Sequence, residues 1–193
     1  MIVLSMTIMN ISKYKIIAVG GVPAVGKSSI ILKFFDNKSK WRKFKFGLVR
    51  GHYNTEDKFM VIGKYLNNKK FQGTDLLSMA VYEDFKKFIQ KKYDYHIIFE
   101  GDRLFTKSIL EFIEKIDNLY VVIIHSKFTE DRHKKRGDTQ TEKFIKGRET
   151  KIKNISKLKF KNGITYLKND CKEDLSLNYS SLIKIINSKY EVL

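Results

Sequence analysis

The chain has 193 residues, of which 42% are hydrophobic, and a formal net charge of +17. This length and apolar content predict one domain, residues 1–193, with a buried core, and exclude an intrinsically disordered chain. The single cysteine, Cys171, excludes a disulfide framework and indicates a reducing compartment. Since no apolar run is long enough to cross a bilayer, we expect no membrane partner and a cytoplasmic location.

The first predicted strand, residues 15–19, leads into a glycine-rich run and then a helix over residues 29–35. This run fits G-x-x-x-x-G-K-S, the phosphate-binding loop of P-loop NTPases. Its glycines let backbone N–H groups point at phosphate oxygens, and the helix N-terminus adds partial positive charge. We expect Lys27 to bridge the β- and γ-phosphates of ATP and Ser28 to bind Mg²⁺. The predicted ATP-binding residues here are Gly21, Val22, Pro23, Ala24, Val25, Gly26, Lys27, Ser28 and Ser29.

Further apolar runs predict strands at 45–49, 95–99, 119–124 and 164–167. Helical patterns lie between and after them: one begins at Thr74 as N-cap, one at Thr106, one covers 144–155, and the last runs from about 182 to the end. Alternating strands and helices predict an α/β fold with a parallel sheet covered on both faces. The polar excursion at about 51–75 follows the second predicted strand. It is a candidate acceptor-binding region, because ligands collect beyond the carboxyl ends of such strands.

The third of the five predicted strands ends in Glu100-Gly101-Asp102-Arg103, two carboxylates followed by a guanidinium. At the sheet edge that holds the loop, one carboxylate would orient Mg²⁺, with Glu100 as the metal candidate, and the other would accept a proton from an attacking hydroxyl. The pattern does not choose between Glu100 and Asp102 as base. Arg103 would hold a substrate phosphate. The alternative is a tight turn whose acidic residues form surface ion pairs.

The fourth predicted strand leads into an arginine-rich segment, a candidate lid at about 128–150. Arg132 and Arg136 are four residues apart, on one face of a helix, so both would reach the triphosphate during transfer. After the fifth predicted strand, Asn169 is a candidate contact to adenine, although ordinary turn chemistry also accounts for it.

Two segments carry most of the excess positive charge. Residues 127–161 hold thirteen Lys or Arg against five Asp or Glu, and residues 36–50 hold six against one. Such clustering indicates a polyanionic partner, because neutralised phosphates release counterions. A solvated basic surface is the alternative.

The loop, Phe71-Gln72-Gly73-Thr74-Asp75, Glu100 to Arg103, and 132–148 with Gly137-Asp138-Thr139-Gln140 together resemble P-loop nucleoside and nucleotide kinases. Within that family the chain is most similar to the 5-hydroxymethyluracil DNA kinases of some bacteriophages. The resemblance implies a P-loop kinase-type three-layer sandwich, with a five-stranded parallel sheet in the order 2-3-1-4-5 and an arginine-rich lid. It also implies transfer of the ATP γ-phosphate, with Mg²⁺, to the hydroxymethyl oxygen of a modified base in DNA.

Candidate substrate-binding residues follow from this reading. Gln72, Thr74 and Asp75 would read a pyrimidine edge, His52 would stack on the base, and Arg50 would bind a backbone phosphate. Two other functions stay open: a small-molecule kinase for a nucleoside or nucleoside monophosphate, and a nucleic-acid-binding ATPase. The absence of N-K-x-D from the sequence argues against a GTPase.

Overall fold

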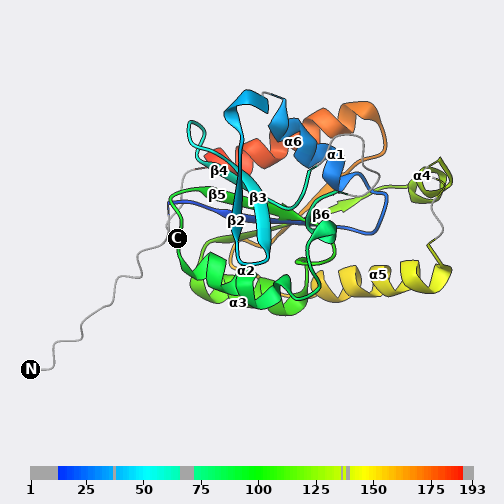
Figure 1. Cartoon of the computed structure of the whole chain (residues 1–193). Helices are drawn as coiled ribbons and strands as arrows, with labels where there is room; N and C mark the ends of the chain where they lie inside the picture. Colours follow the sequence, from blue (N-terminus) through cyan, green and yellow to red (C-terminus); the bar gives the residue numbers. More distant parts are fainter. Residues whose placement is uncertain (1–12, 37, 66–71, 136, 138–139, 189–193) are drawn as a thin grey trace, which may run out of the picture.

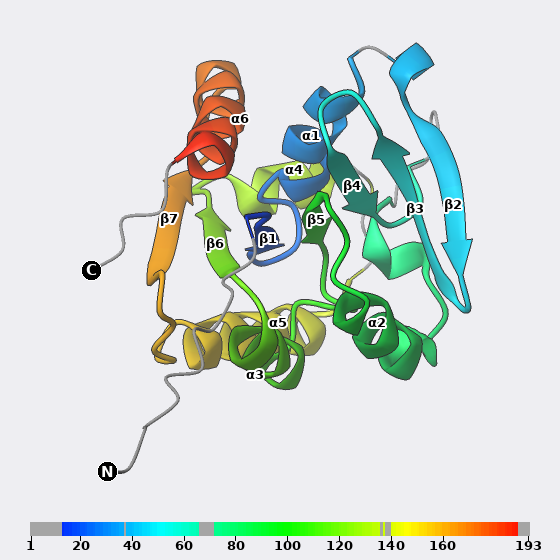
Figure 2. The same ribbon diagram turned by 90° about the vertical axis from the view of Figure 1, so that its left-hand side faces the viewer.

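The computed structural model describes residues 13–36, 38–65, 72–135, 137 and 140–188, and these form a sheet between two layers of helices (Figures 1 and 2). The sheet order is β2-β3-β4-β5-β1-β6-β7. The strands are β1 (Ile16–Gly20), β2 (Arg42–Phe46), β3 (Val49–Asn54), β4 (Phe59–Ile62), β5 (His96–Glu100), β6 (Leu119–His125) and β7 (Ile164–Lys168). The α-helices are α1 (Lys27–Leu32), α2 (Val81–Gln90), α3 (Lys107–Ile116), α4 (Thr129–Lys135), α5 (Glu142–Ile155) and α6 (Lys172–Asn187). Short 3₁₀ helices are η1 (Lys33–Phe35), η2 (Lys38–Lys40) and η3 (Thr74–Leu76).

Each face of the sheet buries a separate apolar cluster. On one face, Ile30 of α1 and Leu182 of α6 pack with side chains of the central strands. On the other, Phe85 of α2, Ile109 of α3 and Ile155 of α5 join a second cluster. Figure 2 shows the two helical layers on opposite sides of the sheet. The predicted α/β class, with helices covering both faces, is confirmed.

The expectation of a five-stranded, all-parallel sheet is wrong. The sheet has seven described strands and is mixed, because β2 pairs antiparallel with β3, and β3 antiparallel with β4. The strand predicted at 45–49 spans the turn of this hairpin, where Gly47 has a positive φ of 52°. Moreover, β4 lies inside the excursion predicted at about 51–75. From β4 through β5, β1 and β6 to β7, neighbouring strands are parallel.

Two predicted helix starts are wrong and one is confirmed. Thr106 caps α3, since its side chain accepts a hydrogen bond from the Ile109 N–H. Thr74 caps no helix: it is buried, its Oγ1 donates to the Glu100 carbonyl oxygen at 2.7 Å, and α2 begins only at Val81. The last helix begins at Lys172, about ten residues before its predicted start, because the Asp174 carboxylate accepts the N–H groups of Asp170 and Cys171 there.

The parallel strands bring five connections to one edge of the sheet. The segments after β1, β4, β5, β6 and β7 begin at this carboxyl edge, and α4 lies beyond it (Figure 1). The sequence-predicted loop, carboxylates and lid are therefore neighbours in space. None of the helices described here is both long and apolar enough to span a bilayer.

Candidate phosphate-binding site

The loop between β1 and α1 has a conformation that requires glycine at two positions. Gly21 and Gly26 have φ values of 141° and 92°, which side chains rarely allow. A Cβ on Gly21 would press against the Ile124 carbonyl oxygen, and one on Gly26 against the Asn169 amide. No described residue accepts a hydrogen bond from the N–H groups of Val22 or of residues 24–26. The loop is therefore a tight cradle with free donors, which suits an anion.

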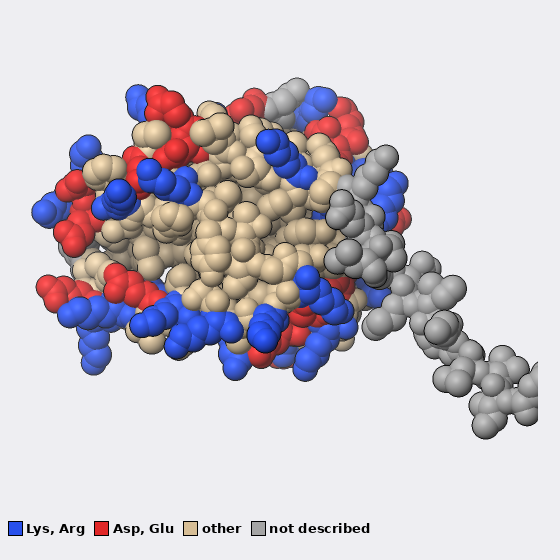
Figure 3. Space-filling model, turned by 180° about the vertical axis from the view of Figure 1, so that it is seen from behind, with Lys and Arg blue, Asp and Glu red and all other residues tan. Residues whose placement is uncertain are grey.

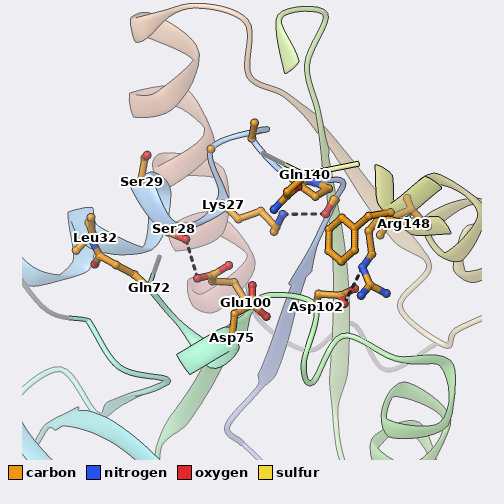
Figure 4. Close-up of a pocket in the computed structure, with 16 residues that line it drawn as sticks. Lys27, Ser28, Ser29, Leu32, Gln72, Asp75, Glu100, Asp102, Gln140 and Arg148 are labelled. Atoms are coloured by element: carbon orange, nitrogen blue, oxygen red, sulfur yellow. Dashed lines mark hydrogen bonds and ion pairs between the residues drawn. The ribbon is translucent and has the colours of Figure 1, made fainter. Parts of the chain in front are cut away.

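Lys27 and Ser28 open α1 and point toward the same pocket (Figure 4). The Lys27 ammonium donates to the carbonyl oxygens of Gly21 and Val22, both at 2.8 Å. The Ser28 hydroxyl donates to Glu100 Oε1 at 2.9 Å. The lysine charge thus lies inside the cradle, and the serine hydroxyl lies between the cradle and a carboxylate.

Glu100 ends β5 beside Val19 of β1, and only 1% of it is exposed. Its Oε1 accepts a second hydrogen bond, from the Tyr65 hydroxyl at 3.3 Å. Burial raises the pKa of Glu100 to about 7, the Lys27 charge opposes this rise, and the Asp75 charge adds to it. Burial and the Glu100 charge also raise the pKa of Tyr65. Glu100 therefore titrates near neutral pH, where it can hold a proton or release it to bind a cation.

Asp75 lies beside Glu100 in the same pocket (Figure 4). Its Oδ1 accepts the Arg103 backbone N–H at 3.1 Å, and the Arg103 guanidinium donates to the Asp75 carbonyl oxygen at 3.4 Å. Gln72 also lines this pocket, whereas Thr74 is buried behind Glu100. Two of the three residues predicted to read a base thus lie next to the cradle. Phe71, from the same motif, lies outside the described residues.

Asp102 lies in the pocket too, but two cations of α5 hold its carboxylate. Arg148 Nε is 3.0 Å from Oδ2, and Lys151 Nζ is 2.6 Å from Oδ1. Lys151 also donates to the Asp102 carbonyl oxygen at 2.8 Å. These ion pairs fasten α5 to the turn after β5. The surface-turn alternative describes Asp102 in part, because its ion pairs are half-exposed.

The predicted lid touches the loop through Arg132 of α4. Its guanidinium donates to the carbonyl oxygens of Ala24 at 3.4 Å and Asn169 at 2.8 Å. Arg136 lies outside the described residues, so its predicted place beside Arg132 stays a prediction. Asp138 and Thr139 of the lid motif lie outside them as well.

Asn169 supports the loop from behind. It is buried, and its Nδ2 donates to the Val25 carbonyl oxygen at 2.6 Å. Its predicted contact to adenine stays a prediction. Arg50 and His52, also predicted to bind substrate, lie in a separate pocket at the β2–β3 hairpin.

The pocket has a volume of about 180 Å³ and receives side chains from several distant segments. Gln140 and Phe144 also line this pocket, and the sequence analysis assigns no role there to either. The Arg148 guanidinium lies 4.5 Å from the centre of the Phe144 ring. It also missed Tyr65, the second donor to Glu100. No periodicity or motif in the sequence signals these contacts, which depend on how α5 and the chain after β4 meet the strand ends.

The residues present fit a magnesium nucleotide. The described residues contain no cluster of three or more His, Cys, Asp or Glu side chains that could hold a metal alone. Mg²⁺ commonly takes one or two carboxylates together with substrate phosphates, so a dedicated protein cage is not required. Ser28 and Glu100, at the foot of an anion cradle, supply suitable oxygens.

No protein-family model matches the chain, and no curated protein matches it. Its function therefore has to be inferred from its own residues.

Proposed function

We propose that the chain is an ATP-dependent phosphotransferase that moves the γ-phosphate of ATP to a hydroxyl acceptor. One observation carries the proposal: the serine after the cradle lysine is hydrogen-bonded to a buried carboxylate at the end of the neighbouring strand. A cation of the cradle, a hydroxyl and a carboxylate with a pKa of about 7 thus share one pocket. This set of groups suits phosphate binding, metal coordination and proton transfer.

The arrangement of the parallel strands supports the same proposal. Counted along the chain, β1, β4, β5, β6 and β7 are the first to fifth parallel strands, and they lie in the order 2-3-1-4-5. This is the order that the resemblance to P-loop kinases implies for the whole sheet. The hairpin of β2 and β3 is then an addition to one edge.

Each group in the pocket has a proposed role. The cradle and Lys27 would hold the phosphates of ATP, and Ser28 would hold Mg²⁺, with Glu100 contacting the ion through water. Mg²⁺ supplies positive charge that neutralises the phosphate oxygens. Arg132 and Arg148, from the lid, are close enough to the pocket to contribute further positive charge.

In the transfer, the acceptor oxygen forms a bond to the γ-phosphorus, the bond from this phosphorus to the bridging oxygen breaks, and ADP leaves. The acceptor proton passes to a carboxylate. Glu100 suits this task because it lines the pocket and its carboxylate accepts hydrogen bonds from two hydroxyl groups, those of Ser28 and Tyr65. Asp102 suits it less, because two cations already neutralise its charge.

For the acceptor, we propose the hydroxymethyl group of 5-hydroxymethyluracil in DNA. The charge distribution supports a polymer, since Lys and Arg side chains gather along the layer of α3 and α5 when the molecule is seen from behind (Figure 3). Residues 36–50, the other basic segment, form η2, β2 and the start of β3. A single small acceptor has no need for two such surfaces.

Transfer of labelled γ-phosphate from ATP tests the proposal, with Mg²⁺ and either DNA containing 5-hydroxymethyluracil, free nucleosides or nucleoside monophosphates. Label on the polymer supports the DNA-base kinase, and label on a small acceptor supports the small-molecule kinase. Release of inorganic phosphate alone, stimulated by nucleic acid, supports the ATPase. Lys27→Ala should abolish transfer, whereas Lys33→Ala, a matched control one helical turn and a half further on, should not. No turnover of ATP with any of these acceptors would refute the proposal.

Separate carboxylate variants identify the base. Glu100→Gln should lower the transfer rate by about 10²-fold or more, the usual contribution of a positioned proton acceptor. Asp102→Asn should lower it by less than about tenfold. The reverse order would assign the proton to Asp102.

A further inference from the structure

A second pocket, of about 210 Å³, lies at the β2–β3 hairpin and belongs to no part of the phosphate site. Its lining includes Lys43 of β2, Arg50 and His52 of β3, and Lys64 and Tyr65 from the chain after β4. This volume is below the roughly 300–1,000 Å³ of pockets for drug-sized molecules, so it suits a single small ring.

The hairpin register places three of these side chains on one face. Lys43 lies opposite His52, and Lys45 opposite Arg50, so all four side chains share a face of the hairpin. The His52 ring contacts Phe35, centroid to centroid at 5.2 Å, which identifies this as the face that α1 and η1 cover. Lys43, Arg50 and His52 therefore line the pocket from one side of the sheet, the side on which Phe35 lies.

Two rings in this pocket offer a surface for a flat ligand. The His52 and Tyr65 rings lie 6.5 Å apart, edge to face, and both contact Phe35. His52 Nδ1 is buried and has no hydrogen-bond partner among the described residues. Burial and the Lys43 charge lower the pKa of His52, so its ring is neutral at pH 7. Buried polar atoms in native proteins nearly always have a hydrogen-bond partner, so a ligand that hydrogen-bonds to Nδ1 would satisfy this atom.

The rim of the pocket is cationic and lacks counterions. Within the described residues, no carboxylate forms an ion pair with Lys43, Arg50 or Lys64. Arg50 Nη1 donates to the carbonyl oxygens of Gly47 and Val49, and these bonds leave the guanidinium charge unneutralised. Three unpaired cations beside two rings match a ligand that joins an aromatic ring to a phosphate.

Tyr65 connects this pocket to the phosphate site. Its ring lines the hairpin pocket, while its hydroxyl donates to Glu100 Oε1 at 3.3 Å. A ligand seated against the ring therefore lies one side chain away from the carboxylate that would accept the proton.

We propose that the hairpin pocket binds a pyrimidine nucleotide, with the base against His52 and Tyr65 and its phosphate on Lys43, Arg50 and Lys64. The proposal rests on the proposed function, because it makes this pocket the acceptor subsite of the phosphotransferase. A nucleotide within a DNA strand and a free mononucleotide share this chemistry, and the test distinguishes them.

The only tryptophan, Trp41, provides a built-in probe. Its ring lies 4.6 Å from Phe35, which contacts both His52 and Tyr65. The full chain, without ATP, is titrated with oligothymidylate, thymidine 5′-monophosphate, thymidine or inorganic phosphate while Trp41 fluorescence is recorded. We expect saturable changes with one or both nucleotide ligands and at least tenfold weaker binding of thymidine and of inorganic phosphate. If oligothymidylate alone binds tightly, the natural ligand is a nucleotide within DNA. If thymidine 5′-monophosphate binds as tightly as oligothymidylate, the natural ligand is a free nucleotide.

Variants locate the binding. His52→Ala should weaken it by about fivefold or more, the usual effect of losing one ring that stacks on a base. Lys43→Ala should weaken it and reduce the slope of log affinity against log salt by about 1 for the strand. Arg42→Ala is the matched control, because Arg42 is the adjacent cation on the opposite face of β2 and should change neither. Tyr65→Phe keeps the aromatic ring and should retain nucleotide binding. This variant tests position 65 without the loss of packing that a smaller side chain would cause.

Three results would overturn the inference, and the first two are the absence of any nucleotide binding and unchanged binding in both His52→Ala and Lys43→Ala. Lys27→Ala distinguishes a failure of this inference from a failure of the proposed function. This variant should abolish phosphate transfer but still bind the pyrimidine nucleotide in the hairpin pocket. Transfer activity that persists undiminished in the pocket variants would leave the phosphotransferase standing and refute the pocket.

Discussion

Replacing Glu100 by Gln should stabilise the folded protein increasingly as pH rises, although it should lower the transfer rate by about 10²-fold or more. Gln has nearly the same shape and can still accept the Ser28 and Tyr65 hydrogen bonds through its amide oxygen. What it removes is a buried negative charge.

The expected size follows from the pKa of Glu100, which burial raises from 4.5 to about 7. Because the folded state holds this proton more tightly, the stabilising contribution is complete below pH 4.5 and is lost as pH rises through 7. The pKa of Glu100 differs by about 2.5 units between the folded and unfolded states, and this difference corresponds to about 3 kcal/mol in the free energy of unfolding. Between pH 5 and pH 8 the contribution of Glu100 to the free energy of unfolding should fall by about 2–3 kcal/mol.

Urea unfolding at several pH values, with EDTA and without nucleotide, measures this effect. The quantity of interest is the free energy of unfolding of Glu100→Gln minus that of the wild type. The contributions of the other titrating groups cancel in this difference. It should rise by about 2–3 kcal/mol from pH 5 to pH 8. Glu83→Gln, on the exposed surface of α2, reports the effect of removing one surface charge. A difference for Glu100→Gln that stays constant with pH would refute the reasoning.

Three further predictions concern stability and local opening. Gly26→Ala should lower the free energy of unfolding by about 1–3 kcal/mol in urea, because φ is 92° there and the new Cβ would meet Asn169. Lys15→Met should cost about 1–3 kcal/mol in the same assay, because the buried ammonium donates to two carbonyl oxygens at the end of α6. Asp102→Asn should speed amide hydrogen exchange in α5 but not in α2, because it weakens the Lys151 and Arg148 ion pairs.

The conformation of the loop between β1 and α1 could be predicted because its sequence signal is local. Gly21 and Gly26 need positive φ values, and Lys27 and Ser28 follow within two residues, so one short segment contains the whole signal. The end of β5 could be predicted for a similar reason, as an apolar run stops at a carboxylate. Parallel strands then bring both segments to one edge of the sheet.

The remaining contacts depend on pairings that no local pattern encodes. The Tyr65 hydroxyl reaches Glu100 across 35 positions of sequence, and Lys151 reaches Asp102 across 49. The hairpin was missed because Phe46 and Val49 read as one apolar run, although Gly47 and Leu48 form its turn. Threonine favours helix N-caps, which predicts a cap at Thr74, but the Thr74 hydroxyl instead donates to the Glu100 carbonyl oxygen.

Glu100 links the stability of the fold to the chemistry of the site. A carboxylate is a poor choice for a purely structural role there, because an amide would satisfy both hydroxyl donors without an uncompensated charge. The Lys27 ammonium opposes the rise in the pKa of Glu100 but does not cancel it, since that pKa stays at about 7. A bound cation would supply the missing positive charge and return the pKa toward its ordinary value. Such a cost at neutral pH is expected of a carboxylate that binds a metal or accepts a proton, which is the role that the proposed function gives to Glu100.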